Sequence, residues 1–148
     1  MKRTPLKKAL VAAVGLAVAL AFLLSRIGVT PPEEGFDPAD YVDAPVVPAE
    51  EAAAHVGSRA TVCGRVEEAT HATDVGGEPT FLNLDGRHPH QPFTAVIWGR
   101  HRPRFAEPPE DRYRGRQVCV SGVVREHDGT PQIEVRDPAQ IQEGGASP

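Results

Sequence analysis

The sequence predicts a small all-β barrel that follows an apolar N-terminal segment. Two related stretches carry this prediction, 60–66 (ATVCGRV) and 118–124 (VCVSGVV). In both of them valines alternate with other residues, which is the period of a half-buried strand. Each stretch also contains a glycine, Gly64 or Gly122, and a glycine there lets a strand bulge or bend as the closure of a small barrel requires.

The N-terminus carries the pattern of an export signal. Residues 1–8 are a basic flank without an acid, and residues 9–24 are uncharged and almost wholly apolar. The apolar run is longer than the core of most signal peptides and lies at the short edge of what spans a bilayer. Residues 9–29 are therefore predicted to be a transmembrane signal-anchor, with a cleaved signal peptide and a buried helix of the domain as alternatives.

The basic flank also predicts the orientation of the chain. Basic residues before an apolar segment keep the N-terminus in the cytoplasm, so the domain is expected outside the cytoplasmic membrane. If the segment is a cleaved signal, the domain is instead secreted. Residues 30–47 are rich in proline and in acids, and they predict a semi-extended linker between the anchor and the domain.

Charge argues against a strongly basic surface. The chain has 16 Lys and Arg, 20 Asp and Glu, and a formal net charge of −4. All acids lie beyond residue 30, whereas residues 1–30 hold several of the bases. From residue 58 onward the balance is close to neutral, which weakens the case for tight non-specific binding to phosphate backbones.

The predicted domain spans residues 48–142 and begins with a short helix. Pro48 suits the first turn of that helix and Gly57 ends it. Residues 143–148 are predicted to be a disordered tail. Turn residues separate the strands that follow the helix, and the Asp-Gly pair at 128–129 predicts a hairpin between the last two. Five strands are predicted, at about 60–69, 80–84, 93–99, 116–126 and 132–136.

Five short strands with the longest connection between the third and the fourth give the order of a Greek-key OB-fold barrel. The sequence resembles bacterial OB-fold domains related to anticodon-binding and other nucleic-acid-binding modules, which also occur in exported proteins. That resemblance implies a nucleic-acid-binding domain, although a fold by itself does not imply a ligand. The stretches that carry it are 55–66 (HVGSRATVCGRV), 79–84 (PTFLNL), 92–98 (PFTAVIW), 118–124 (VCVSGVV) and 131–135 (PQIEV).

An OB barrel usually binds its ligand on the second and third strands and on the loops beside them. The matching loops here are 71–78 and 127–131. Aromatic rings stack on unpaired bases, and arginines take phosphates. The alternation of residues does not settle which aromatic side chains of this face point outward. For each of them the alternative is a place in the core. The side chains predicted on this face are Phe81, Asn83, Phe93, Thr94, Trp98 and Arg100.

Segment 99–116 is the most basic part of the domain. It predicts a phosphate-binding rim that includes Arg100, Arg102, Arg104 and Arg114, or a patch that faces anionic lipid. The alternative is a solvated loop whose arginines pair with its own acids.

The two cysteines, Cys63 and Cys119, predict one disulfide in an exported chain. Each lies on the face of its strand opposite the valines, so in neighbouring strands both sulfur atoms project from the same side of the sheet. Two separate buried thiols are the alternative.

No pattern in the sequence predicts catalysis, a metal or a cofactor. His88 and His90 form a close pair, but no cysteine or carboxylate follows at the spacing of a metal site. No nucleophile with a base and no glycine-rich phosphate loop is present. The sequence therefore predicts a binding module for single-stranded nucleic acid, with an envelope protein bound through the same face as the alternative partner.

Overall fold

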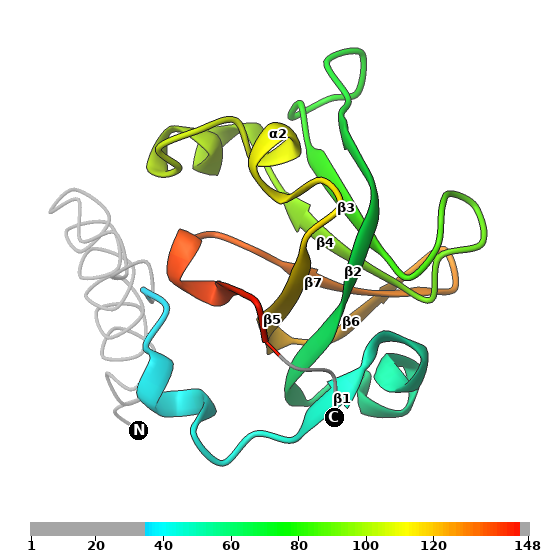
Figure 1. The fold of residues 1–148 in the computed structure, drawn as a ribbon, viewed down its shortest axis with the longest axis vertical. Coiled ribbons are helices and arrows are strands. Elements are labelled where there is room, and N and C mark those ends of the chain that lie inside the picture. Colours follow the sequence, from blue (N-terminus) through cyan, green and yellow to red (C-terminus); the bar gives the residue numbers. More distant parts are fainter. Residues whose placement is uncertain (1–34, 146–148) are drawn as a thin grey trace, which may run out of the picture. The chain divides into compact units, whose positions relative to one another are not determined.

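Residues 35–145 of the 148-residue chain are described by a computed structural model, in which they form a mostly β domain (Figure 1). The predicted signal-anchor lies outside the described residues, and no helix within residues 35–145 is long and apolar enough to cross a membrane. The short helices are η1 (Pro38–Tyr41), η2 (Ala49–His55), η3 (Gly99–Arg104), α2 (Pro109–Tyr113) and η4 (Pro138–Gln140). The strands are β1 (Val46–Pro48), β2 (Arg59–His71), β3 (Thr80–Leu84), β4 (Phe93–Ile97), β5 (Gln117–Val123), β6 (Arg125–His127), β7 (Thr130–Glu134) and β8 (Ile141–Glu143).

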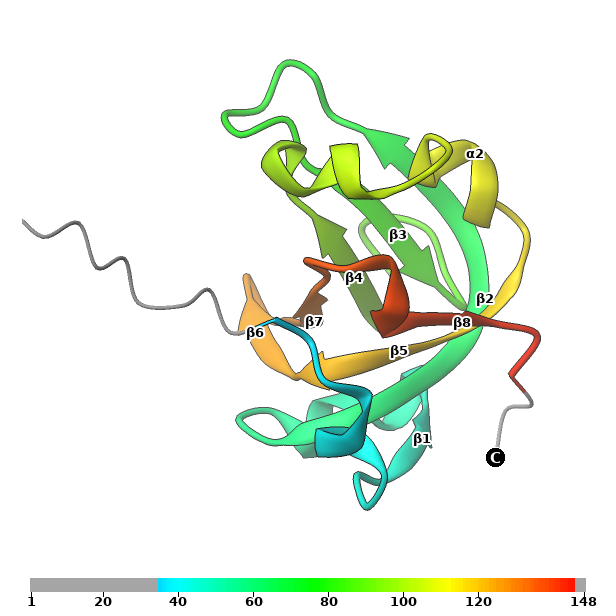
Figure 2. The same ribbon diagram turned by 90° about the vertical axis from the view of Figure 1, so that its left-hand side faces the viewer.

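The long strand β2 organises the domain because it takes part in two different pairings. Residues 59–65 pair antiparallel with β5, and residues 66–71 pair antiparallel with β3. The β2–β3 register shifts between Val66 and Glu68, which marks a β-bulge. Figures 1 and 2 show β2 curving along the domain. Because a bulge increases the twist and bend of a strand, one strand reaches both halves of the barrel.

The remaining pairings give an OB-like arrangement of strands. The strand order is β7-β4-β3-β2-β5, and β4 and β7 run parallel. Strand β5 continues through Val124 into β6, which forms an antiparallel hairpin with β7. The five predicted strands therefore correspond to β2, β3, β4, β5 with β6, and β7. Their order is that of an OB-like fold, and the long connection between β4 and β5 holds η3 and α2.

The core of the barrel consists of the inward-facing side chains of these strands. Leu82, Phe93, Ile97 and Ile133 are fully buried there, and burial of such apolar surface is the main stabilising term of a fold. A Cβ atom at Gly122 would overlap Cγ2 of Ile133. The glycine therefore lets β5 and β7 approach each other closely.

The structure contains the predicted disulfide between Cys63 and Cys119. The two residues lie directly opposite each other in the β2–β5 register. Val62 and Val120 beside them are fully buried in the core, so the cysteines project from the other face of the sheet. Cys63 is nevertheless fully buried and Cys119 nearly so.

Two segments outside the five strands also pair with the barrel. The predicted semi-extended linker, 30–47, contains η1 and most of β1, and β1 pairs in parallel with β2 through Val46 opposite Thr61. At the other end, β8 pairs antiparallel with β5. Strands this short show too little alternation to be found from the sequence. The helix predicted at 48–57 is the 3-10 helix η2, and residues 146–148 of the predicted tail lie outside the described residues.

Candidate functional site

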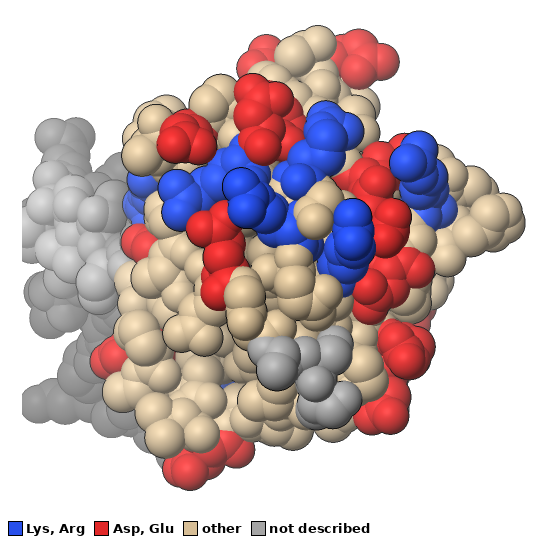
Figure 3. All heavy atoms as spheres, in the orientation of Figure 1, with Lys and Arg blue, Asp and Glu red and all other residues tan. Residues whose placement is uncertain are grey.

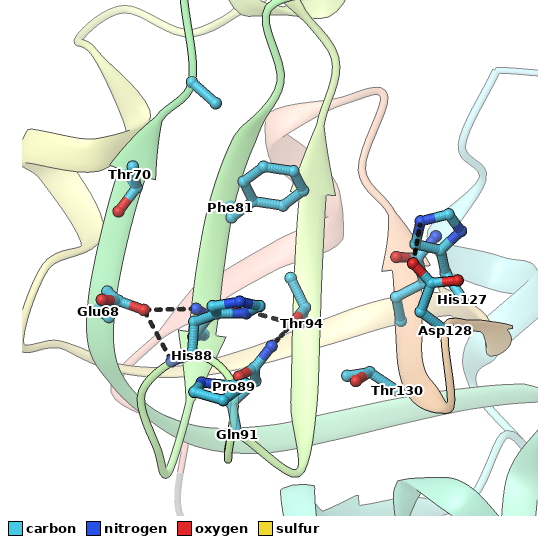
Figure 4. A pocket seen from close by; sticks show the side chains of 13 residues that line it. Glu68, Thr70, Phe81, His88, Pro89, Gln91, Thr94, His127, Asp128 and Thr130 are labelled. Carbon is cyan, nitrogen blue, oxygen red and sulfur yellow. Dashed lines mark hydrogen bonds and ion pairs between the residues drawn. The ribbon is translucent and has the colours of Figure 1, made fainter. Parts of the chain in front are cut away.

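A groove lies on the outer face of β2, β3 and β4, and its volume is about 570 Å³. Side chains alternate along β3, so Phe81 and Asn83 face the groove whereas Leu82 and Leu84 face the core. The loop between β3 and β4 and the turn between β6 and β7 form two of its sides (Figure 4). The lining residues are Glu68, Thr70, Ala72, Phe81, Asn83, His88, Pro89, Gln91, Thr94, His127, Asp128, Thr130 and Gln132.

Four side chains of the lining, Glu68, Asn83, Thr94 and Gln91, form a set of linked hydrogen bonds that we call the polar network. Asn83 Nδ2 donates to Oε2 of Glu68 at 2.8 Å, and the Thr94 hydroxyl donates to Oδ1 of Asn83 at 2.9 Å. Gln91 Nε2 donates to Oγ1 of Thr94 at 3.3 Å. The backbone N–H of His88 also donates to Oε2 of Glu68, at 2.9 Å, so the network joins three strands to the loop after β3 (Figure 4).

The carboxylate of Glu68 fixes the direction of the polar network. The hydrogen bond from the His88 backbone, and next that from Asn83, lower the pKa of Glu68 below its ordinary value although partial burial opposes them. An ionised carboxylate only accepts hydrogen bonds, so Asn83 must turn Nδ2 toward Glu68 and Oδ1 toward Thr94. Thr94 then gives its single hydrogen to Asn83 and accepts from Gln91.

Phe81 supplies the aromatic surface of the groove. Its ring is partly exposed, and the residue pairs with Thr70 of β2. Figure 4 shows the ring beside the row formed by Glu68 and His88. An apolar ring next to fixed polar groups suits a planar ligand, because the ring stacks on its face while the polar groups bind its edge.

The groove is not basic. Its lining contains the carboxylates of Glu68 and Asp128 and no Lys or Arg. At the rim, His127 Nε2 lies 3.5 Å from Oδ2 of Asp128, and both side chains are exposed. Anionic groups of a ligand therefore gain little electrostatic energy from the groove itself.

Phe81 and Asn83, both predicted from the sequence, line the groove, whereas Phe93 and Trp98 do not. Phe93 is fully buried, so its ring belongs to the core and cannot stack on a ligand. The structure thus removes Phe93 from the candidate site. Trp98 is half-buried against the loop after β2, where a Cβ atom at Gly77 would lie 3.1 Å from the indole ring.

The arginines selected from the sequence have partners within the domain. Arg102 donates to both carboxylate oxygens of Glu110, at 2.7 and 3.1 Å, and also to the hydroxyl of Thr80. Arg114 donates to the backbone oxygen of Ala69 at 2.7 Å. These contacts attach η3 and the segment after α2 to the strands. Figure 3 shows Arg side chains on one face of the domain, gathered among Asp and Glu side chains.

Arg100 and Arg104 belong to a second cluster, around Glu134 on β7. Oε1 of Glu134 lies 3.0 Å from Nη2 of Arg100 and 3.2 Å from Nε of Arg136. Arg104 donates to the backbone oxygen of Arg136 at 3.2 Å. His101 is buried at this cluster, and Nε of Arg100 donates to its Nε2 at 3.1 Å. Burial first, and then the charges of Arg100 and Arg104, lower the pKa of His101, which favours its neutral form.

Metal-ligating residues are not grouped in the part of the chain that the structure describes. No three His, Cys, Asp or Glu side chains within residues 35–145 lie together as a metal site. His88 and His90, the close pair in the sequence, are both exposed on the loop between β3 and β4.

Comparison with known proteins gives similarity in structure only. No protein-family model matches the sequence, and no curated protein matches it. Similar solved structures include asparaginyl-tRNA synthetase from Pyrococcus horikoshii, with 19% identity over 68% of this chain and a TM-score of 0.44. Another is Entamoeba histolytica asparaginyl-tRNA synthetase in complex with asparaginyl-adenylate, with 18% identity over 70% of this chain and a TM-score of 0.43.

The matched regions cover 23% and 24% of those synthetase chains, so this chain is similar to less than a quarter of each. At these TM-scores the assignment of an OB-like fold rests on the strand order of the chain itself.

Proposed function

We propose that the groove binds single-stranded nucleic acid by seating an unpaired base against Phe81. The observation that supports this proposal is one partly exposed aromatic ring beside a fixed polar network, in a groove of about 570 Å³. Stacking of a base on an aromatic side chain contributes about 1–3 kcal/mol, and amide and carboxylate groups read the edges of unpaired bases. On this proposal the domain is a binding module and not an enzyme.

The charges favour contact with the base over contact with the phosphates. The lining has no Lys or Arg, and the arginines of segment 99–116 selected above have acceptors within the domain. Each phosphate that a protein neutralises on a single strand steepens the dependence of log affinity on log salt by about 0.7. We therefore expect affinity to fall only gently as salt rises.

We also propose that the domain is tethered on the outer side of the cytoplasmic membrane. The basic flank at 1–8 and the apolar run at 9–24 support this location, as does the Cys63–Cys119 disulfide, since disulfides persist in oxidising compartments. Protease added to right-side-out membrane vesicles should then digest the domain. Full protection of the domain in sealed vesicles would overturn the proposed location.

An envelope protein is the second candidate partner, and the acidity of the groove favours it. Glu68 and Asp128 place two carboxylates in the lining, which suits a basic peptide better than a phosphate backbone. A basic peptide would compete with the oligonucleotide for the groove. Its affinity would come from the carboxylates and not from a base stacked on Phe81.

The test is a titration of the purified full chain against short fluorescein-labelled oligonucleotides at low and moderate salt, followed by anisotropy. We expect saturable binding that Phe81→Ala weakens by about 5- to 150-fold, the equivalent of one lost stacking contact. Phe36→Ala is the matched control, because that ring contacts Tyr41 outside the groove lining. If no oligonucleotide binds the folded chain, the proposal is wrong and the search moves to envelope proteins.

A further inference from the structure

We infer that the groove selects guanine among unpaired bases, through the carboxylate of Glu68. This inference rests on the proposed function, and it names the base that the same site accepts.

Each donor group of the polar network makes one hydrogen bond within the protein. Asn83 donates to Glu68, Thr94 donates its only hydroxyl hydrogen to Asn83, and Gln91 donates to Thr94. The His88 backbone N–H is also directed at Glu68. Oε1 of Gln91 is buried and has no hydrogen-bond partner within residues 35–145. The charged acceptor of this row is therefore the carboxylate of Glu68, next to amides that each keep a second N–H.

Glu68 is the acceptor that a ligand can reach. Both of its hydrogen bonds end at Oε2, so within the described residues Oε1 keeps its two lone-pair sites for a ligand. The side chain is half-buried and lines the groove. Because the two donors hold the carboxylate in its ionised form and in one orientation, it presents a fixed negative acceptor.

Strand geometry places that acceptor at the edge of a base stacked on Phe81. Glu68 is the register partner of Asn83, and Thr70 is the partner of Phe81. Phe81 and Asn83 face the same side of β3, about 6.8 Å apart along the strand. A base that covers the ring therefore extends its edge toward the row of Glu68 and Asn83. Figure 4 shows the positions of Phe81 and Glu68.

The edges of the four bases differ in what they offer such an acceptor. Guanine carries two adjacent donors, N1–H and the N2 amino group, which can converge on one carboxylate oxygen in charge-assisted hydrogen bonds. Adenine and cytosine each place a bare ring nitrogen beside their amino group, and that lone pair is repelled by the carboxylate. Uracil and thymine have one N–H between two carbonyl oxygens. Guanine is therefore the base whose edge fits Glu68 best.

The experiment measures the affinity of the full chain for short oligothymidylates that carry one central guanine, adenine or cytosine. We expect the guanine strand to bind about tenfold more tightly than the others, within the range of one well-formed pair of base contacts. Inosine lacks the N2 amino group, so an inosine strand should keep only part of this preference. A 1-methylguanine strand lacks N1–H and should lose the whole preference. These analogues test the inference on the unaltered protein.

Two matched variants assign the preference to Glu68. Glu68→Gln should abolish the preference for guanine, whereas Glu67→Gln removes a charge from the neighbouring residue, which pairs with Arg65 outside the groove lining, and should keep it. Equal affinity for all strands, or a preference that persists in a folded Glu68→Gln chain, would overturn the inference while leaving the proposed function in place. Absence of binding to any strand would overturn both.

Discussion

The hydroxyl of Thr94 donates a hydrogen bond of 2.9 Å to Oδ1 of Asn83, and so joins β4 to β3 on the outer face of the barrel. Thr94 is only 5% exposed and Asn83 only 4%, so this contact is buried although it faces away from the core. A buried polar atom left without a partner costs about 1–3 kcal/mol. The same bond therefore supports the stability of the sheet and the geometry of the groove.

The first prediction concerns this bond. Thr94→Val keeps the shape of the side chain but leaves Oδ1 of Asn83 and Nε2 of Gln91 without their partner. We expect the free energy of unfolding in urea to fall by about 1–3 kcal/mol, and oligonucleotide affinity to fall because Asn83 can turn its amide. Thr73→Val, on an exposed loop, should change neither quantity. Equal losses in the two variants would contradict a specific role for the bond.

The second prediction concerns the close approach of β5 and β7. Gly122→Ala would bring a methyl group into overlap with Cγ2 of Ile133, and neither β5 nor β7 can move without disturbing the core. Overpacking of this kind costs about 1–3 kcal/mol, so the urea midpoint should fall clearly. Gly76→Ala meets nothing within 4 Å and is the control. A Gly122→Ala protein as stable as the control would show that the strands separate easily.

The third prediction concerns acid stability. Burial, and then the charges of Arg100 and Arg104, lower the pKa of His101 in the folded state, so the unfolded state takes up this proton first as the pH falls. The contribution of His101 is fully present above its ordinary pKa, near 6.5, and is lost as the pH falls from there through the lowered folded-state value. His101→Gln should therefore reduce the loss of stability between about pH 7 and pH 5.

The measurement for His101 is urea unfolding across that range of pH. His127→Gln serves as the control, since His127 is exposed at the groove rim and should leave the pH dependence of unfolding unchanged. If His101→Gln unfolds with the same pH dependence as the unaltered protein, the buried cluster around Glu134 does not govern stability in this range.

The fourth prediction concerns the disulfide. Replacement of both Cys63 and Cys119 by alanine opens a loop with a sequence separation of 56 residues. The chain-entropy model gives a loss of about 4 kcal/mol for a loop of this length. Reductant should destabilise the unaltered protein by a similar amount and have no effect on the double variant. Equal thermal unfolding of the two proteins without reductant would mean that the cross-link does not limit the unfolded state.

The strands and their order were predictable because their signals are local. Alternating β-branched residues in β2 and β5 and an unambiguous turn before β7 required no knowledge of distant contacts. Asp128 and Gly129 both have positive φ, at 49° and 79°, which is the conformation that the Asp-Gly pair predicted for the hairpin. The short strands β1 and β8 were not predictable, because three residues cannot display a period.

Glu68, the most important residue of the candidate site, could not be predicted from the sequence because β2 contains a bulge. Strict alternation from Val62 through Val66 would direct Glu68 toward the core. The register shift between Val66 and Glu68 reverses this parity, so Ala69 is buried and Glu68 lines the groove. A one-residue change of register moves every later side chain to the other face of a strand. No sequence pattern within 60–69 predicts where that register shift occurs.

The hydrogen-bond partners of the arginines could not be predicted from the sequence either. Arg114 reaches the backbone of Ala69, 45 positions earlier, and Arg100 reaches Glu134, 34 positions later. Local composition favoured a basic surface at 99–116, because the acids and carbonyl groups that accept these hydrogen bonds come from other strands. Pairing with an acid of the same segment is found for Arg102, which binds Glu110, whereas Arg100 and Arg114 bind groups outside 99–116.

The Cys63–Cys119 disulfide encloses the β2–β3 loop, whose residues 73–78 are all exposed. A protease that cuts this loop would separate Glu68 from Phe81 along the backbone, yet the two pieces would stay joined through sulfur. Such a nicked molecule would migrate as intact on a non-reducing gel and divide into two fragments on a reducing one. A gel therefore shows whether the backbone between Glu68 and Phe81 is intact only when the disulfide has been reduced.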